Sequence, residues 1–347
     1  MRHEDHSDDR KCHNDPLLRR RTNKCYDDTP MQTISFENGD EMPMIGLGTW
    51  KSPPGEVYDA VKTALETGYR HIDCAPIYKN ETEVGNALRD AFDAGTTSRE
   101  DVWVTSKLWN DAHHPDDVRP ALTQTLEDLQ LDTLDLYLMH WPVALKPGVD
   151  FPESPDDFVS LEEVPLTETW AAMEALKDDG LVHHIGVSNF SVPNLQMILD
   201  EGEVRPEMNQ VEMHPYLPQP DLVSFAEAQN IPITAYSPLG SGDRPDAMKA
   251  DDEPTLMQNP VINEIAEAHG VSPAQVLLQW GLSRGTAVIP KSTTPAHIED
   301  NLAAADLELS AEERDTIDAL DQNYRYLKGG GWTMEGSPYT QADLWGE

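Results

Sequence analysis

Apolar and polar positions alternate along the chain in two patterns. Short apolar segments are typical of buried strands, and the longer segments between them repeat their apolar residues with the period of a helix. Strands are predicted at 45–48, 71–73, 102–106, 134–139, 182–187, 208–211, 231–235 and 287–289. Helices are predicted at 55–68, 82–93, 115–129, 167–179, 192–200, 219–229 and 261–283. Much of the chain therefore reads as a repeated strand–helix unit.

Strand–helix repetition predicts an α/β fold with parallel strands joined by right-handed crossovers. Eight such units in roughly 260 residues favour a closed (β/α)8 TIM barrel over two open sheets. Helix starts are marked at Ser272-Pro273 and Thr294-Pro295. The Asn38-Gly39 pair ahead of the first unit is a strong hairpin signal. We expect an N-terminal β-hairpin that caps the floor of the barrel.

Polar side chains follow strand after strand at the point where each apolar segment ends. In a (β/α)8 barrel these ends lie on one face, which carries the active site. Any single member could be structural, as a helix cap, a surface charge or a core histidine, but their succession favours a site. They are Asp73, Lys107, His140, Ser188, Asn189, Asn209, Gln210, Tyr236, Ser237, Lys291 and Ser292.

The charge balance is strongly acidic, with 63 Asp and Glu against 25 Lys and Arg and a net charge of −38. The acids are spread over nearly every predicted helix. Nucleic acid and anionic membranes are therefore poor partners. Such an excess predicts solubility in concentrated salt, where screening removes self-repulsion; an ordinary acidic protein is the alternative interpretation.

Residues 1–30 differ from the rest, with seven basic and seven acidic residues and little apolar patterning. We expect a disordered extension. Met31 opens the patterned part, 31–347, and is a second candidate for the start of translation. Three cysteines in 347 residues favour a reducing interior over a disulfide scaffold. No signal peptide or membrane-spanning stretch is recognisable, so a cytoplasmic location is expected.

Several long motifs cover the strand ends and the loops that follow them. They are GLGTWK at 46–51, GYRHIDCAPIYKNETEVG at 68–85, VTSKLWN at 104–110, DLYLMHWP at 135–142, IGVSNF at 185–190, NQVEMHPYL at 209–217, AYSPLGS at 235–241 and VIPKSTTP at 288–295. With these motifs the chain resembles the aldo-keto reductase family over about residues 32–327, and within it most closely the aldehyde reductases (NADP-dependent alcohol dehydrogenases). The resemblance implies NAD(P)H-dependent, reversible reduction of small aldehydes or ketones to alcohols by a monomer.

The family's catalytic tetrad carries over onto Asp73, Tyr78, Lys107 and His140. Reduction of a carbonyl places charge on its oxygen, which an acid must protonate, and the resemblance gives this role to Tyr78. A free tyrosine has a pKa of about 10. We expect the Lys107 ammonium to lower that pKa, Asp73 to hold Lys107, and His140 to orient the carbonyl or assist proton transfer.

The resemblance also assigns cofactor contacts. Ser188, Asn189 and Gln210 would bind the nicotinamide carboxamide, and Tyr236 would stack on the nicotinamide ring. The loop 240–258 would fold over the dinucleotide, with Asp243 paired to Lys51 or Lys291; a solvated acidic connection is the alternative for this loop. The expected ribose, pyrophosphate and adenosine contacts are Thr49, Lys51, Ser237, Leu239, Ser241, Lys291, Ser292, His297 and Asn301.

One position departs from the family pattern. His297 stands where NADP-preferring members often carry arginine, and histidine offers no bidentate fork to a 2′-phosphate. Because Lys291, Ser292 and Asn301 are intact, we expect NADP(H), with NAD(H) as the alternative.

Aromatic residues are expected to form the substrate pocket. Trp50, Trp109 and Trp141 match the aromatic walls of the family, which suit aldehydes with apolar or mixed bodies, and His140 would face the same substrate. The segment 328–347 corresponds to the region that sets substrate choice in the family. Ordinary packing at the barrel rim would also explain these tryptophans.

Other sequence features point to different classes of protein. Tyr58 and Lys62, and again Tyr324 and Lys328, have the Y-x-x-x-K spacing of short-chain dehydrogenases, but the glycine-rich turn those enzymes need is missing. No histidine pair has metal-ligand spacing, so no metal is expected. The alternative from a different class is a non-catalytic NADP-binding module that senses redox state.

Overall fold

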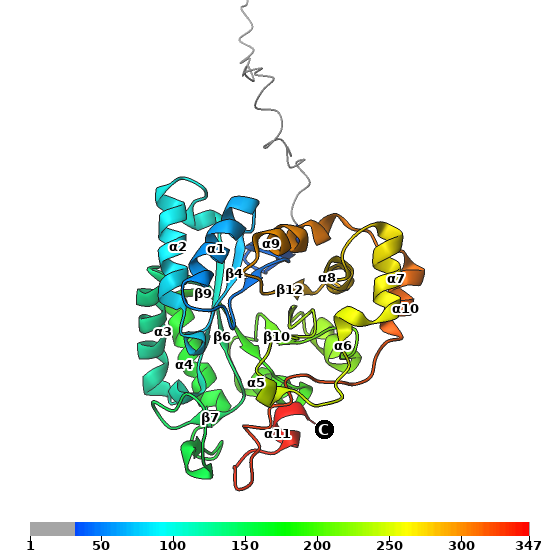
Figure 1. Cartoon of the computed structure of the whole chain (residues 1–347). Helices are drawn as coiled ribbons and strands as arrows, with labels where there is room; N and C mark the ends of the chain where they lie inside the picture. The colour runs from blue at the N-terminus through cyan, green and yellow to red at the C-terminus, as the bar shows by residue number, and fades with distance from the viewer. Residues whose placement is uncertain (1–31, 347) are drawn as a thin grey trace, which may run out of the picture. The chain divides into compact units, whose positions relative to one another are not determined.

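The computed structural model describes residues 32–346 (Figure 1). Its main sheet has eight parallel strands, which confirms the predicted (β/α)8 architecture. Hydrogen bonds connect them in the order β12-β11-β10-β9-β6-β5-β4-β3. The strands are β3 (Leu47–Gly48), β4 (His71–Asp73), β5 (Trp103–Leu108), β6 (Leu134–Met139), β9 (Val182–Ser188), β10 (Asn209–Glu212), β11 (Ile233–Tyr236) and β12 (Ala287–Val288).

Backbone hydrogen bonds close the sheet between its first and last strands. The N–H of Gly46 donates to the carbonyl of Val288 at 2.9 Å, and the N–H of Val288 donates to the carbonyl of Met44 at 2.7 Å. Parallel bridges join Ile45 to Val288 and Gly48 to Lys291. Neither edge strand is left unpaired at this seam, as a barrel requires.

Helices follow the strands and cover the outside of the sheet (Figure 1). Each buries an apolar face, as α1 does with Val57, Val61 and Leu65. The helices are α1 (Glu56–Thr67), α2 (Glu81–Asp93), α3 (Pro115–Leu129), α4 (Leu166–Asp178), α5 (Val192–Glu201), α6 (Pro220–Ala228), α7 (Pro260–His269), α8 (Pro273–Ser283), α9 (Pro295–Leu302), α10 (Ala311–Asp318) and α11 (Gln341–Trp345).

The single helix predicted at 261–283 is wrong, because two helices occupy this stretch. α7 ends at Gly270, which has a φ of 66° in the left-handed region that favours glycine. α8 begins after Ser272, whose side chain and that of Gln275 form a reciprocal capping box. The helix start predicted at Ser272-Pro273 is confirmed as the start of α8, although the stretch around it was predicted as one helix.

The predicted N-terminal hairpin is present, as β1 (Thr33–Ser35) and β2 (Glu41–Pro43). Phe36, next to its turn, stacks on Trp103 and lies at a tilt against the buried ring of His184; these two residues are near the amino ends of β5 and β9. Asp40 and Glu207 hold the two ring nitrogens of His184 at 2.9 and 2.8 Å. The hairpin therefore packs on the floor of the barrel.

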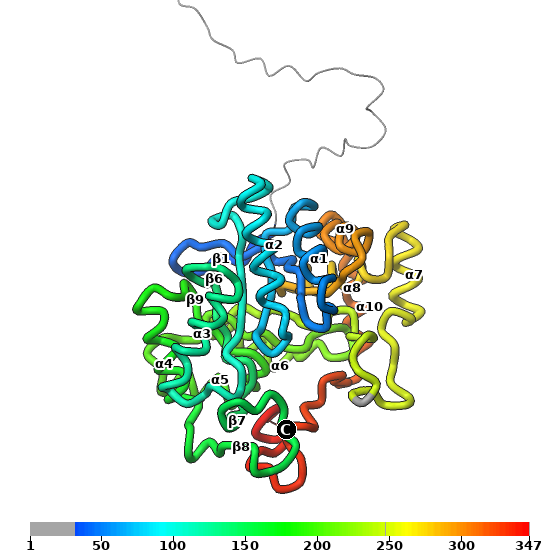
Figure 2. The backbone as a smooth tube through the Cα atoms, turned by 60° about the vertical axis from the view of Figure 1, so that its left-hand side comes forward, coloured from blue at the N-terminus to red at the C-terminus, as the bar shows by residue number. Residues whose placement is uncertain are grey.

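A second hairpin lies at the opposite end of the barrel and was not predicted. It pairs β7 (Ala144–Leu145) with β8 (Phe158–Val159) in antiparallel fashion. Tyr339 of the C-terminal segment accepts a hydrogen bond from the N–H of Ala144 and donates one to the carbonyl of Val159. Figure 2 shows the two segments side by side. Together they build one rim around the carboxyl ends of the strands.

Within residues 32–346, no helix combines the length and apolar character needed to cross a membrane. The extension predicted at 1–30, with its Cys12 and Cys25, lies outside the described residues.

Candidate active site

A cavity of about 820 Å³ opens at the carboxyl ends of the barrel strands. Its walls come from the strand ends, from the loop 240–258 and from the C-terminal segment. Asp73, Tyr78 and His140 line it together with the cofactor candidates of β9, β10 and β11. The polar strand ends of the sequence therefore meet around one space.

Asp73 and Lys107 form a buried ion pair at the base of this cavity. The Nζ atom of Lys107 donates to Oδ1 of Asp73 at 2.6 Å and to the carbonyl of Cys74 at 2.8 Å. The other carboxylate oxygen of Asp73 accepts from Nε2 of Gln210 at 2.7 Å. Asp73 thus fixes two neighbouring side chains, and Lys107 has no exposed surface.

Tyr78 stands over this pair in a single 3₁₀ turn, Pro76–Tyr78, directly after β4. Lys79 ends the turn with a φ of 58°, and Nδ2 of Asn80 donates to the carbonyl of Thr49 at 2.9 Å. These contacts fix the turn against the barrel. As a result the Tyr78 ring lies 5.3 Å from Nζ of Lys107.

The expected lowering of the Tyr78 pKa is wrong. Burial raises the pKa of Tyr78 well above its usual value, and the charges of Asp73 and Glu81 act in the same direction. The reason is that Asp73 already pairs with Lys107, so the ammonium cannot offset the desolvation of a phenolate. Tyr78 therefore keeps its proton at neutral pH.

His140 lies beside Tyr78, with ring centres 6.0 Å apart and planes nearly perpendicular. Burial lowers the pKa of His140 well below its usual value, and the positive charge of Lys107 lowers it further. Its Nδ1 is buried and has no hydrogen-bond partner among the described residues. A neutral imidazole at this point can orient a carbonyl group by hydrogen bonding without carrying charge.

The side chains at the ends of β9, β10 and β11 hold one another. Oη of Tyr236 donates to Oδ1 of Asn189 at 2.6 Å, and Nδ2 of Asn189 donates to the carbonyl of His140 at 2.9 Å. Oγ of Ser188 donates to the carbonyl of Gln210 at 2.8 Å. The donor groups of Tyr236, Asn189 and Ser188 are thus bound to protein acceptors. These side chains therefore offer a bound molecule mainly acceptor oxygens.

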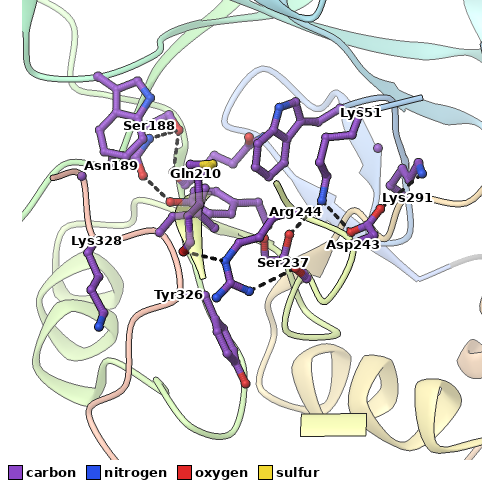
Figure 3. A pocket seen from close by; sticks show the side chains of 18 of the residues that line it. Lys51, Ser188, Asn189, Gln210, Ser237, Asp243, Arg244, Lys291, Tyr326 and Lys328 are labelled. Carbon is purple, nitrogen blue, oxygen red and sulfur yellow. Dashed lines mark hydrogen bonds and ion pairs between the residues drawn. The ribbon is translucent and has the colours of Figure 1, made fainter. Parts of the chain in front are cut away.

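Cations gather at the other end of the cavity. Nζ of Lys51 donates to Oδ1 of Asp243 at 2.6 Å and to Oγ of Ser241 at 2.9 Å. Nζ of Lys291 reaches the second oxygen of Asp243 at 3.3 Å (Figure 3). Asp243 therefore pairs with both lysines, and the loop 240–258 is fastened across the cavity.

Some predicted contacts do not line this cavity. Thr49 is buried beneath it, with Oγ1 donating to the carbonyl of Asp73 at 2.8 Å. Ser292 is buried near the start of α9, where its Oγ accepts from the N–H of Thr294 at 3.1 Å. On α9 itself, His297 is exposed and Asn301 is buried. Ser237, Leu239 and the tryptophans at 50, 109 and 141 do line the cavity.

Comparison with known proteins agrees with this geometry. A model of the aldo/keto reductase family matches residues 44–322. The chain is a member of that family. It is 55% identical to an aldo/keto reductase of Synechocystis sp. over 317 residues, covering 91% of this chain and 97% of that protein. It is 50% identical to aldo-keto reductase family 1 member A1 of Rattus norvegicus, covering 85% of this chain and 91% of that protein.

A solved structure extends the likeness to three dimensions. The aldose reductase of Schistosoma japonicum superimposes with a TM-score of 0.79 at 43% identity, covering 87% of this chain and 96% of that one. As a member of this family, the protein is an oxidoreductase that acts on small-molecule carbonyl compounds with a nicotinamide cofactor.

The substrate end of this aldo/keto reductase contains Trp332, which belongs to the segment 328–347 expected to set substrate choice, and Phe151, which the sequence analysis did not assign. Trp332 of the C-terminal segment packs against Trp109 and Trp141, with ring centres 5.9 and 5.6 Å apart. Phe151 lies near-parallel to Trp332 at 6.2 Å and is 61% exposed. Phe151 does not directly follow a barrel strand, so the strand-end argument did not find it.

Arg244 and Tyr326 also line the cavity of this aldo/keto reductase and were not predicted. Arg244 is almost fully buried, and an arginine is rarely buried to this extent unless charged or polar groups pair with it. It lies in the loop 240–258, for which the sequence left open a solvated acidic connection. The partners of Arg244 are brought together only when this loop folds, so the sequence pattern did not reveal them.

Proposed function

We propose that this aldo/keto reductase is an NADPH-dependent aldehyde reductase in which Tyr78 donates the proton. The observation that carries the proposal is the meeting of Tyr78, His140 and the Asp73–Lys107 pair at one wall of the cavity. Among the tyrosines that line the cavity, Tyr78 is the one whose ring lies beside both His140 and Lys107.

The residues present fit a nicotinamide dinucleotide. Lys51 and Lys291 supply positive charge for a pyrophosphate, and their partner Asp243 belongs to a loop that spans the cavity. Asp73 holds Nε2 of Gln210, which leaves Oε1 of Gln210 to accept a hydrogen bond from a carboxamide N–H₂. The bound cofactor would supply a hydride to the carbonyl carbon of the substrate.

The protein's own residues then handle the carbonyl oxygen. His140, neutral, donates a hydrogen bond to it and sets its direction. As the new C–H bond forms and the C=O π bond breaks, Tyr78 transfers the proton of its hydroxyl to the oxygen. The high pKa of Tyr78 keeps this proton in place until an alkoxide, which is more basic than a phenolate, develops. The phenolate regains a proton from solvent after the alcohol leaves.

Aldehydes with apolar or mixed bodies are the proposed substrates. Trp50, Trp109, Trp141 and Trp332 all line the cavity near Tyr78 and offer flat apolar surface. NADPH is the proposed cofactor because Lys291, Ser292 and Asn301 match the family pattern, with NADH as the alternative because His297 stands where NADP-preferring members often carry a bidentate arginine.

A panel of aldehydes and sugars, assayed with NADPH and NADH in low and in molar salt, tests the proposal. We expect NADPH oxidation with aryl and alkyl aldehydes. NADPH binding without turnover of any carbonyl compound would instead favour a non-catalytic, redox-sensing module. Failure of the protein to bind either nucleotide would contradict both.

A further inference from the structure

Tyr326 touches the loop 240–258 at two separate points. The guanidinium carbon of Arg244, near the start of the loop, lies 4.9 Å from the centre of the Tyr326 ring. The hydroxyl of Tyr326 donates to the carbonyl of Pro254, near the end of the loop, at 2.7 Å. One side chain, just ahead of the C-terminal segment 328–347, therefore contacts both arms of the loop.

Close approach of the loop backbone to this ring adds a third contact. Gly240 has a φ of +84°, and a Cβ atom at this position would lie 3.2 Å from Cε2 of Tyr326. Such a distance is shorter than normal packing permits without adjustment. Glycine is thus needed here both for its backbone conformation and because the ring lies directly against it.

Arg244 organises the inside of the loop. It forms an ion pair with Glu253 and donates to the carbonyls of Ser241 and Met248 at 3.2 and 3.3 Å. Its neighbour Asp243 is the residue that binds Lys51 and Lys291. Figure 3 shows Arg244 between Tyr326 and the lysine cluster. Contact with Tyr326 therefore stabilises the same turn that fastens the loop across the cavity.

The backbone around Tyr326 is anchored to the barrel independently of the loop. The N–H groups of Tyr326 and Leu327 donate to the two carboxylate oxygens of Glu212, at 2.7 and 2.8 Å. Glu212 is fully buried at the end of β10 and pairs with His214 at 2.8 Å. A bidentate, buried carboxylate fixes the direction in which the C-terminal segment leaves the barrel.

Tyr326 and Leu327 line the cavity from the side of the C-terminal segment, and Arg244 lines it from the side of the loop. We propose that Tyr326 is a positioning residue that couples two parts of the site. It links closure of the loop 240–258 over the nucleotide to the position of the cavity wall that Tyr326, Leu327 and the C-terminal segment form on the substrate side. The inference rests on the proposed function, since it assumes that the loop covers a nucleotide. Weakening the contacts of Tyr326 with the loop should then speed release of the nucleotide and displace the C-terminal segment from the substrate.

The test compares Tyr326→Phe with Tyr58→Phe. The first change removes the hydroxyl that binds Pro254 and leaves the ring under Arg244. The second removes a hydroxyl that donates to Asp90 at 2.7 Å on the outer face of α1, away from the cavity. NADPH dissociation is followed by stopped-flow recovery of tryptophan fluorescence. We expect Tyr326→Phe to speed dissociation about two- to tenfold, which corresponds to one lost hydrogen bond, with an unchanged association rate.

Two further readouts separate positioning from a merely structural role. Trypsin should cleave the loop after Lys249 faster in NADPH-saturated Tyr326→Phe than in the NADPH-saturated parent protein. The KM for an aryl aldehyde should rise more than kcat falls, because the hydroxyl does not touch the reacting atoms. Tyr58→Phe should change none of these.

Glu212→Gln supplies a second variant, since Glu212 does not line the cavity. An amide must turn an N–H₂ group toward one of the two backbone N–H donors, which frees the segment from the barrel. We expect faster NADPH dissociation here as well. Dissociation within twofold of the parent in both variants would overturn the inference, whereas absence of NADPH binding by the parent would overturn the proposed function.

Discussion

The ammonium group of Lys107 faces the ring of Tyr78 at 5.3 Å but gives its hydrogen bonds to Asp73 and to the backbone of Cys74. Lys107 therefore acts on the phenol through Asp73, because its ammonium neutralises a carboxylate whose charge raises the pKa of Tyr78. Removing the phenol and removing the ammonium should consequently have different side effects, although both disable the same acid.

Tyr78→Phe should lower kcat by about 10²- to 10⁴-fold, the value of a positioned proton donor. The fold and the nucleotide site should survive, because only one oxygen is lost. Steady-state kinetics and NADPH titration by fluorescence quenching check this. Retention of most of kcat would make His140 the better candidate for the proton donor.

Lys107→Met should lower kcat to a similar level and also destabilise the protein. Loss of the ammonium leaves Asp73 buried without its cation, which costs about 3–5 kcal/mol in comparable pairs. The kinetic losses of the Tyr78→Phe and Lys107→Met variants should not add, since they remove one function. A double variant much slower than either single one would contradict these roles. Thermal unfolding of each variant measures the stability cost.

Glu81 should make stability fall as pH rises through neutrality. Burial raises its pKa to about 7, although Ser106 and Thr125 donate hydrogen bonds to it. A carboxyl with a raised folded-state pKa stabilises the fold below its unfolded pKa of about 4.3, and that contribution is lost as pH rises through 7.

Glu81→Gln should therefore unfold at higher temperature than the parent at pH 8, and the difference should vanish below about pH 4, where Glu81 is protonated in both the folded and the unfolded state. The expected difference is of the order of 3 kcal/mol. Glu100→Gln, on an exposed side chain, removes the same charge without the burial and serves as control. A constant difference between parent and Glu81→Gln across this pH range would show that Glu81 does not titrate there.

Melting temperature should rise steeply from dilute buffer to molar salt. With a net charge of −38, repulsion between surface acids acts over about 30 Å at 0.01 M salt and about 3 Å at 1 M. Calorimetry over this range checks the expectation. An unchanged melting temperature would mean that the acids are compensated locally and that the protein is not adapted to salt.

His297→Arg should improve NADPH binding and leave NADH binding nearly unchanged. His297 is exposed on α9, close in sequence to Lys291, and arginine can offer a fork to a 2′-phosphate. The KM values for the two nucleotides measure the effect. If neither value changes, α9 does not face the adenosine end of the cofactor.

The local pattern of apolar and polar residues was enough to predict helices and strands that bury a continuous apolar face. The predicted bounds of β4, β6 and α3 coincide with those of the structure, because each is set by its own apolar residues and flanking turns. The β7–β8 hairpin could not be predicted in this way, since its stability comes from Tyr339 and the C-terminal segment far along the chain.

The same distinction applies to the candidate site. Strand ends located Asp73, Lys107 and His140, because parallel strands bring their carboxyl ends together whatever the loops do. The direction of the Tyr78 pKa depends on how deeply the ring is buried, and the place of Arg244 depends on Tyr326. Neither burial depth nor a contact between distant loops is encoded in a short stretch of sequence.

The seam of the barrel has a consequence for biosynthesis. Gly46 meets Val288 across it, and Lys51 and Lys291 stand at its upper end on either side of Asp243. A nascent chain emerging from the ribosome carries the first of these partners long before the second has been translated. Until then the amino-terminal strand is an open edge, with backbone groups exposed to pairing by other chains. Ribosome-bound intermediates of this protein therefore depend on protection of residues 44–48 until synthesis is almost complete.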